Sequence, residues 1–215
     1  MKKIATLLIG FLFILSGSQP VFAQQRTDSN MVTTKVGNPV STTSTIASAA
    51  MDLATTVGAA CGGKVQGANI SCLQGLSFSS VSYPDSAIQQ LSNSALAYYC
   101  KDSDPSLGTC LQCVGFVQAA VMGATGSVLN NGGNAKDYAT KIPSGYQYYT
   151  VGGGTDIQEG DIIIKTGGDF GHIAVVVQVY SQTAIKVAEA NFNYGGEVGT
   201  NDTATALWQG FLRKQ

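Results

Sequence analysis

The sequence predicts an α+β fold in which helices come first and an antiparallel β-sheet follows. A helical pattern covers residues 113–124, where Val114, Val117 and Val121 fall on one face. Runs rich in β-branched residues, separated by Gly, Asp or Asn turns, follow at 161–166, 173–180, 184–190 and 205–213. Strands that come after helices, instead of alternating with them, favour a layered α+β architecture over βαβ units.

Residues 1–23 are typical of a secretory signal peptide. Lys2 and Lys3 precede the apolar run IATLLIGFLFIL, and a small-residue cleavage site ends at Ala23. A retained membrane anchor is the alternative, but a membrane-spanning helix needs about 20 apolar residues. We therefore expect a secreted or cell-envelope protein with no stable membrane insertion after cleavage.

The rest of the chain divides by composition. Residues 24–45 are polar and rich in Ser, Thr and Asn, which predicts a flexible linker. Residues 46–85 predict a weakly structured segment with one short helix at 46–60. Residues 86–215 hold the other predicted elements, beginning with a helix that runs through Tyr98, and form the main domain.

The charge composition excludes two classes of partner. Only 12% of the residues are charged, the formal net charge is −1, and no cluster of basic residues occurs anywhere. Binding to nucleic acid or to anionic lipid through bulk charge requires such a cluster. We therefore expect no nucleic-acid partner, and we expect the exported protein to be a monomer.

Five cysteines bear on function: Cys61, Cys72, Cys100, Cys110 and Cys113. Outside the cytosol, paired thiols tend to form disulfides, and an odd number leaves at least one thiol unpaired within a monomer. The stretch TCLQCV, which contains Cys110 and Cys113, has three interpretations. It holds a redox pair, two metal ligands, or a structural cysteine beside a catalytic one.

The only histidine, His172, opens an apolar strand directly after a glycine-rich turn. A lone histidine is more often a satisfied polar residue than a catalytic one. Here, however, the next strand carries Glu189 and Asn191, which strand alternation places on one face. A base with an orienting partner, together with Cys113 at the positive end of a helix macrodipole, is the sequence pattern of a cysteine nucleophile site.

Five motifs in order make the chain resemble the CHAP domain, the cysteine/histidine-dependent amidohydrolase/peptidase family of peptidoglycan hydrolases. They are LQCVGFVQ, GGNAKDY, EGDIIIKTGGDFGHIAVVVQV, VAEANF and WQGFLRK, spread over residues 111–214. The resemblance implies a papain-like α+β fold, with the catalytic cysteine at a helix start packed on an antiparallel sheet. It also implies a substrate, peptidoglycan, in which an amide bond is cleaved.

The resemblance assigns a role to each matching residue. Cys113 is the nucleophile, His172 the general base, Glu189 the residue that orients the histidine, and Asn191 a fourth polar group. Gln112, just before the nucleophile, either helps to hold the oxyanion, as the resemblance implies, or is an exposed neighbour of the helix cap. Because the acidic calcium loop of some relatives has no counterpart, we expect no metal and no other cofactor. Where the GNA motif usually continues to a tryptophan, Tyr138 stands instead, and we expect it to alter the wall of the cleft.

A nucleophile locked in a disulfide cannot attack, so the hydrolase interpretation makes Cys113 the unpaired thiol. Of the possible pairings we favour Cys61–Cys72 and Cys100–Cys110, because each pair brackets a turn-rich loop. Two other functions stay open: a thiol–disulfide oxidoreductase using Cys110 and Cys113, and a non-catalytic wall-binding module. The oxidoreductase requires a βαβ context with a strand just before the cysteine pair, and residues 100–109 predict turns instead. Zinc binding would require a second close pair of ligands.

Overall fold

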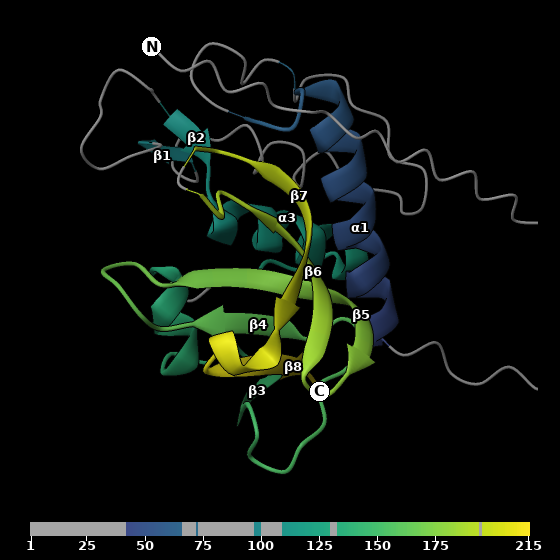
Figure 1. Ribbon diagram of the computed structural model, residues 1–215, viewed down its shortest axis with the longest axis vertical. Coiled ribbons are helices and arrows are strands. Elements are labelled where there is room, and N and C mark those ends of the chain that lie inside the picture. The colour runs from purple at the N-terminus through teal and green to yellow at the C-terminus, as the bar shows by residue number, and fades with distance from the viewer. Residues whose placement is uncertain (1–41, 66–71, 73–96, 100–108, 130–132, 194) are drawn as a thin grey trace, which may run out of the picture. The chain divides into compact units, whose positions relative to one another are not determined.

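A six-stranded antiparallel sheet is the central layer of the computed structural model, which describes residues 42–65, 72, 97–99, 109–129, 133–193 and 195–215 (Figure 1). The spatial order of the strands is β3-β8-β4-β5-β6-β7, with every neighbouring pair antiparallel. The strand bounds are β3 (Tyr146–Thr150), β4 (Ile162–Lys165), β5 (His172–Ser181), β6 (Ala184–Ala190), β7 (Val198–Ala204) and β8 (Gly210–Lys214). The α+β prediction is confirmed.

The central strands form where the sequence is apolar at successive positions. In β4, Ile162 and Ile164 face one hydrophobic cluster while Ile163 faces a second, and all three are fully buried. Strand β5 alternates in the same way. Runs of this kind are buried on both faces of a sheet, whereas a strand with one solvated face alternates apolar and polar residues. The sheet therefore lies between two apolar layers.

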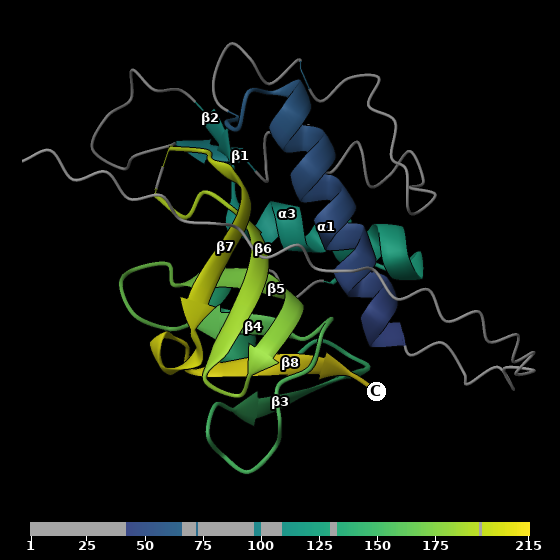
Figure 2. The same ribbon diagram turned by 45° about the vertical axis from the view of Figure 1, so that its right-hand side comes forward.

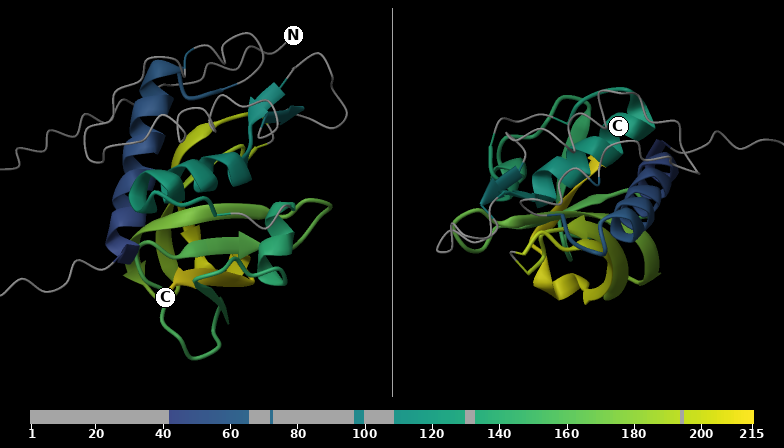
Figure 3. Two further views of the ribbon diagram at one scale, coloured as in Figure 1. Left: turned by 180° about the vertical axis from the view of Figure 1, so that it is seen from behind. Right: turned by 90° about the horizontal axis from the view of Figure 1, so that it is seen from above.

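Two helices, α1 (Thr42–Ala60) and α3 (Cys113–Thr125), build the first layer with one face of the sheet (Figures 2 and 3). In α1 the fully buried residues Ile46, Ala50, Leu53 and Val57 recur at helical spacing and share one core cluster with residues of α3 and the sheet. The helix expected at 46–60 is thus present, and it begins at Thr42. The domain boundaries stay a prediction, but this helix is part of the main core.

The second layer covers the opposite face of the sheet. It is a smaller cluster that includes Trp208, Phe211 and Ile157. Trp208 directly follows the short 3-10 helix η4 (Thr205–Leu207), and β8 begins two residues later. The single strand expected at 205–213 is therefore a helical turn followed by a strand.

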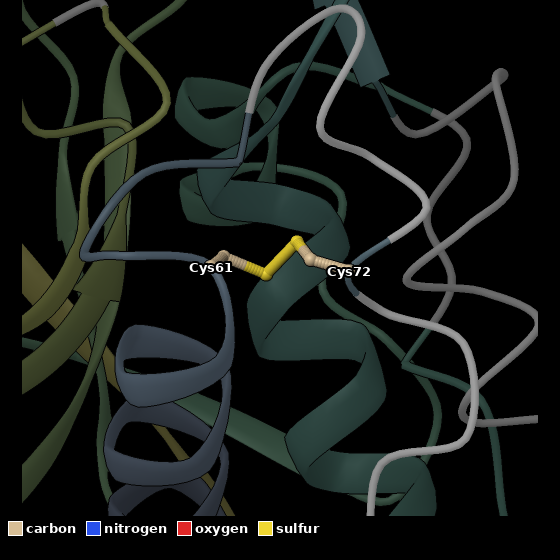
Figure 4. Close-up of a disulfide and its surroundings, with 2 residues drawn as sticks. All are labelled: Cys61 and Cys72. Atoms are coloured by element: carbon tan, nitrogen blue, oxygen red, sulfur yellow. A yellow bond between two sulfur atoms is a disulfide. The ribbon is translucent and has the colours of Figure 1, made fainter.

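A disulfide between Cys61 and Cys72 closes the chain that follows α1 (Figure 4). This is one of the two bonds expected from the sequence. Closing a loop of this length reduces the entropy of the unfolded chain and is worth about 2–3 kcal/mol. The other expected bond, Cys100–Cys110, lies outside the residues whose side chains the structure describes.

Several elements differ from the expectation. Tyr98 was expected in a helix but lies in β1 (Ala97–Tyr99), which pairs antiparallel with β2 (Thr109–Leu111). Strands β3 and β7 were not predicted, because their residues do not alternate cleanly between apolar and polar. The expected signal peptide and most of the expected linker lie outside the described residues. Among the described helices, none is long and apolar enough to cross a membrane.

Candidate functional site

Cys113 is the first residue of α3, and Gln112 precedes it in an extended conformation as the N-cap. The backbone N–H groups of the first helical turn have no partner within the helix, so this end of α3 carries a partial positive charge. Cys113 is 8% exposed and is the free cysteine among the described residues. The sequence LQCVGFVQ thus presents a thiol at the end of a helix anchored by its buried apolar residues.

His172 is the first residue of β5, and the glycine before it sets its position. Gly171 has a φ of +72°, in the left-handed region that suits glycine. A Cβ at this position would lie 2.5 Å from the Lys165 carbonyl oxygen and 2.7 Å from the Lys136 nitrogen. Two chain segments therefore lie very close to Gly171, and the Gly-His sequence places the imidazole at the start of the interior strand β5.

Glu189 on β6 lies beside His172, with 2.6 Å between Glu189 Oε2 and His172 Nε2. The other carboxylate oxygen, Oε1, accepts a hydrogen bond of 2.8 Å from Asn201 Nδ2 on β7. Gly199 pairs directly with Glu189 across the two strands, so the side chain of Asn201, two residues further on, lies on the same face. Both oxygens of this buried carboxylate are therefore satisfied.

The pKa of His172 reflects these neighbours. Burial lowers it, but hydrogen bonds and charge interactions with Cys113 and Glu189 outweigh burial and raise the pKa from 6.5 to about 9. Because Nε2 faces Glu189, Nδ1 is the ring nitrogen that remains for Cys113. At neutral pH the imidazole is therefore protonated and lies between a carboxylate and a sulfur atom.

Alternation along one continuous strand predicts that Asn191 lies on the same face as Glu189, but residue 191 lies outside the strand. Strand β6 ends at Ala190, and Asn191 has a φ of 58°. Its Nδ2 donates to Gln112 Oε1 over 2.9 Å, and its Oδ1 accepts from the Gly196 nitrogen. The amide thus connects the end of β6 to the start of α3 and fixes the orientation of the Gln112 side chain.

A cavity of about 290 Å³ opens on the His172–Glu189 pair. It is lined by Lys165, Gly171, His172, Glu189, Asn191, Phe192, Asn201, Asp202, Thr203 and Trp208. The Trp208 ring lies 5.9 Å from the His172 ring, centroid to centroid, and its Nε1 donates to Thr203 Oγ1. Sequence reasoning did not single out Asn201, Lys165 or Trp208 as site residues. The motif WQGFLRK contains Trp208, but no pattern in the neighbouring sequence indicated that the indole lies beside His172.

Tyr138 was expected on the wall of the cleft, and this expectation is wrong. It lies in the 3-10 helix η3 (Ala135–Ala139) and is fully buried. Its hydroxyl donates to the Leu129 carbonyl and accepts from Gln118 Nε2, both at 3.1 Å. A phenol provides a hydroxyl that satisfies these polar groups inside the core, so the residue braces η3 against α3.

Two findings bear on the oxidoreductase interpretation. Residues 100–108, which were expected to form turns, lie outside the described residues, and β2 contains Cys110 itself and ends just before α3. The strand pairs antiparallel with β1, however, and the described strands contain no parallel pair, so the βαβ context is absent from the described part of the fold. Within the same residues, no group of three or more His, Cys, Asp or Glu side chains is placed to hold a metal ion.

Residues 103–191 match the CHAP domain. The match confirms the resemblance inferred from the five motifs. It covers less than half of the chain, and it includes Gln112, Cys113, His172, Glu189 and Asn191.

The chain is also similar to two staphylococcal secretory antigens. It is 34% identical over 104 residues to the staphylococcal secretory antigen ssaA2 of Staphylococcus aureus, which covers 48% of this chain and 36% of that protein. It is 35% identical over 104 residues to the staphylococcal secretory antigen SsaA of the same species, covering 48% and 38%. The aligned stretch thus spans little more than a third of either relative.

Proposed function

We propose that the protein is a secreted cysteine hydrolase that cleaves amide bonds in peptidoglycan. The observation that carries the proposal is the His172 imidazole, paired with Glu189 at 2.6 Å and interacting with Cys113 at the start of α3. A thiolate beside an oriented imidazolium is the nucleophile–base arrangement of cysteine hydrolases. The CHAP match supports peptidoglycan as the substrate, and the names of the relatives support secretion.

The proposed reaction proceeds in two steps. The Cys113 thiolate attacks the amide carbonyl carbon, and the resulting oxyanion is stabilised by the Cys113 backbone N–H and the Gln112 side-chain amide. As the C–N bond breaks, His172 gives its proton to the leaving amine, and a thioester forms. Water then attacks the thioester while His172 accepts its proton, and the product acid and the thiolate are released.

The other polar residues hold this machinery in place. Glu189 stabilises the imidazolium and fixes the ring so that Nδ1 faces Cys113. Asn191 fixes the amide of Gln112 through the 2.9 Å hydrogen bond to its oxygen. We propose that the bond cleaved is the one between muramic acid and L-alanine, or one within the peptide.

Purified cell wall tests the proposal directly. The native protein should release soluble fragments whose masses identify the bond, and Cys113→Ala and His172→Ala should each lower the rate by at least about 10³-fold. Val114→Ala, which changes the next residue on the same helix, is the control for helix stability. Undiminished hydrolysis by a folded Cys113→Ala protein would exclude the mechanism. Wall binding without any hydrolysis by the native protein would indicate a non-catalytic module.

A further inference from the structure

One cation in the cavity is not used by the proposed mechanism. Lys165 pairs directly with His172 across strands β4 and β5, so both side chains leave the same face of the sheet. Lys165 lines the cavity together with His172. Its ammonium therefore lies on the side of the His172 imidazole, in a cavity that Cys113 does not line, and it takes no part in the transfer of protons.

An aromatic ring holds this ammonium in position. Lys165 Nζ lies 4.4 Å from the centre of the Trp208 ring, within the range of a cation–π interaction. Trp208 is itself fixed, since it is 3% exposed and its Nε1 donates to Thr203 over 3.3 Å. The lysine thus rests on a rigid surface and has lost part of the mobility of a free surface side chain.

The charge of Lys165 is not neutralised by an acidic side chain among the described residues, whose ion pairs do not include it. Asp202 also lines the cavity, but its carboxylate accepts from the Tyr180 hydroxyl at 2.9 Å and lies 3.9 Å from Lys186 Nζ. Glu189 is occupied by His172 and Asn201. The two carboxylates of the cavity thus have other partners, and the ammonium can receive an anion.

We propose that Lys165 is a specificity residue that binds a carboxylate of an acidic peptide substrate on the His172 side of the site. This inference rests on the proposed function and adds the substrate class. Hydrogen bonds between an ammonium and a carboxylate are stronger than those between neutral groups. A peptide with a free carboxylate at this position should therefore bind better than one in which this group is a carboxamide.

A matched pair of synthetic muramoyl tripeptides, identical except that one glutamate carboxyl is free or is a carboxamide, tests the inference. Binding is measured in the Cys113→Ala protein, which keeps the ligand intact. Trp208 is the only tryptophan of the chain, so its fluorescence reports on this cavity. We expect the acid to bind about ten-fold more tightly than the amide, and the difference to shrink in high salt.

Three lysine variants test which residue causes the preference for the acid peptide. Lys165→Gln should abolish the preference by weakening binding of the acid alone, and Lys165→Arg should keep it. Lys214→Gln is the matched control, because Lys214 also lies over an aromatic ring, that of Tyr146, but does not line the cavity. If the Lys214→Gln protein also loses its preference for the acid, that preference depends on the overall charge of the protein, and the inference is overturned.

The test separates this inference from the proposed function. Equal affinity for the two peptides, no binding of either, or a preference that survives in Lys165→Gln overturns the role of Lys165. None of these results changes whether the native protein hydrolyses cell wall. Conversely, a native protein without hydrolase activity leaves the binding measurement intact, because that measurement needs no turnover.

Discussion

Nε2 of His172 lies 2.6 Å from Oε2 of Glu189, and this carboxylate acts together with Cys113 to raise the pKa of the imidazole. Burial alone would lower the pKa of the imidazole. The hydrogen bonds and charges of Cys113 and Glu189 raise it to about 9 instead. The balance between burial and these partners leads to the first prediction.

The first prediction concerns pH. His172 should titrate near pH 9 and not near 6.5, and the alkaline limb of the hydrolysis rate should follow it. Because His172 is the only histidine, one pair of imidazole resonances in an NMR titration reports its pKa. Glu189→Gln removes a negative charge, so it should shift the midpoint toward 6.5 and slow hydrolysis. A midpoint near 6.5 in the native protein would contradict the interpretation.

The free energy of unfolding should depend on the same titration of His172. The pKa of His172 is higher in the folded protein than the 6.5 of an unperturbed histidine, so protonation favours the folded state. This contribution is complete below pH 6.5 and is lost as the pH rises to about 9. Urea unfolding of the native and Glu189→Gln proteins across this range should show a smaller decline for the variant.

The second prediction concerns Asn201, whose Nδ2 donates a hydrogen bond of 2.8 Å to Glu189 Oε1. It acts through Glu189, so we class it as a positioning residue. Asn201→Ala frees the carboxylate to rotate away from the imidazole, and we expect hydrolysis to fall about ten-fold, in keeping with the loss of a hydrogen bond to a charged group. The NMR midpoint of His172 should also move down, which a loss of stability alone would not cause.

Thr200→Ala is the matched control for Asn201. Thr200 is exposed and is the neighbouring residue on the same strand, so its side chain leaves the opposite face. The control should leave both the rate and the His172 midpoint unchanged. An Asn201→Ala protein with a normal midpoint would show that Asn201 does not position the pair.

The places of Cys113 and His172 at the start of a helix and of a strand were predictable from local patterns, while their catalytic roles stay a proposal. Cys113 precedes an apolar helical pattern, and His172 stands between a glycine turn and an apolar strand, so both positions follow from neighbouring residues. Asn201 and Trp208 carry no such signal. Asn201 reaches Glu189 only through the pairing of β6 with β7, and Trp208 reaches His172 only through the packing of the second hydrophobic layer.

The expectations for Asn191 and Tyr138 failed for specific physical reasons. Alternation places Glu189 and Asn191 on one face only if the strand continues, but it ends at Ala190, and the left-handed conformation of Asn191 turns its side chain toward Gln112. Tyr138 was expected at the surface of the cleft because of the motif that contains it. Its depth in the core depends on η3 packing against β4, β5 and β8, which the motif alone does not specify.

The third prediction concerns the turn before His172. Gly171→Ala combines an unfavourable positive φ with close contacts to the Lys165 carbonyl and Lys136. Gly168 in the same loop has a similar φ of +74°, but a Cβ there would meet nothing within 4 Å. Gly168→Ala therefore measures the backbone strain alone, about 1–2 kcal/mol. Gly171→Ala should lower the free energy of unfolding in urea clearly more than Gly168→Ala does, and it should also lower activity. An equal loss in the two variants would show that the close contacts relax.

The last prediction concerns the thiols, and it separates the hydrolase from the oxidoreductase. Cys113 is free and Cys61 is bonded to Cys72 in the structure, so alkylation of the native protein followed by non-reducing peptide mapping should place the label on Cys113. Cys100 and Cys110 should appear as a linked peptide if the second expected bond forms. Prior modification of Cys113 should abolish wall hydrolysis, because the thiolate is the proposed nucleophile. A dominant Cys110–Cys113 bond in the oxidised protein would instead mean that Cys113 cannot attack an amide in that state, and it would favour a redox role for the pair.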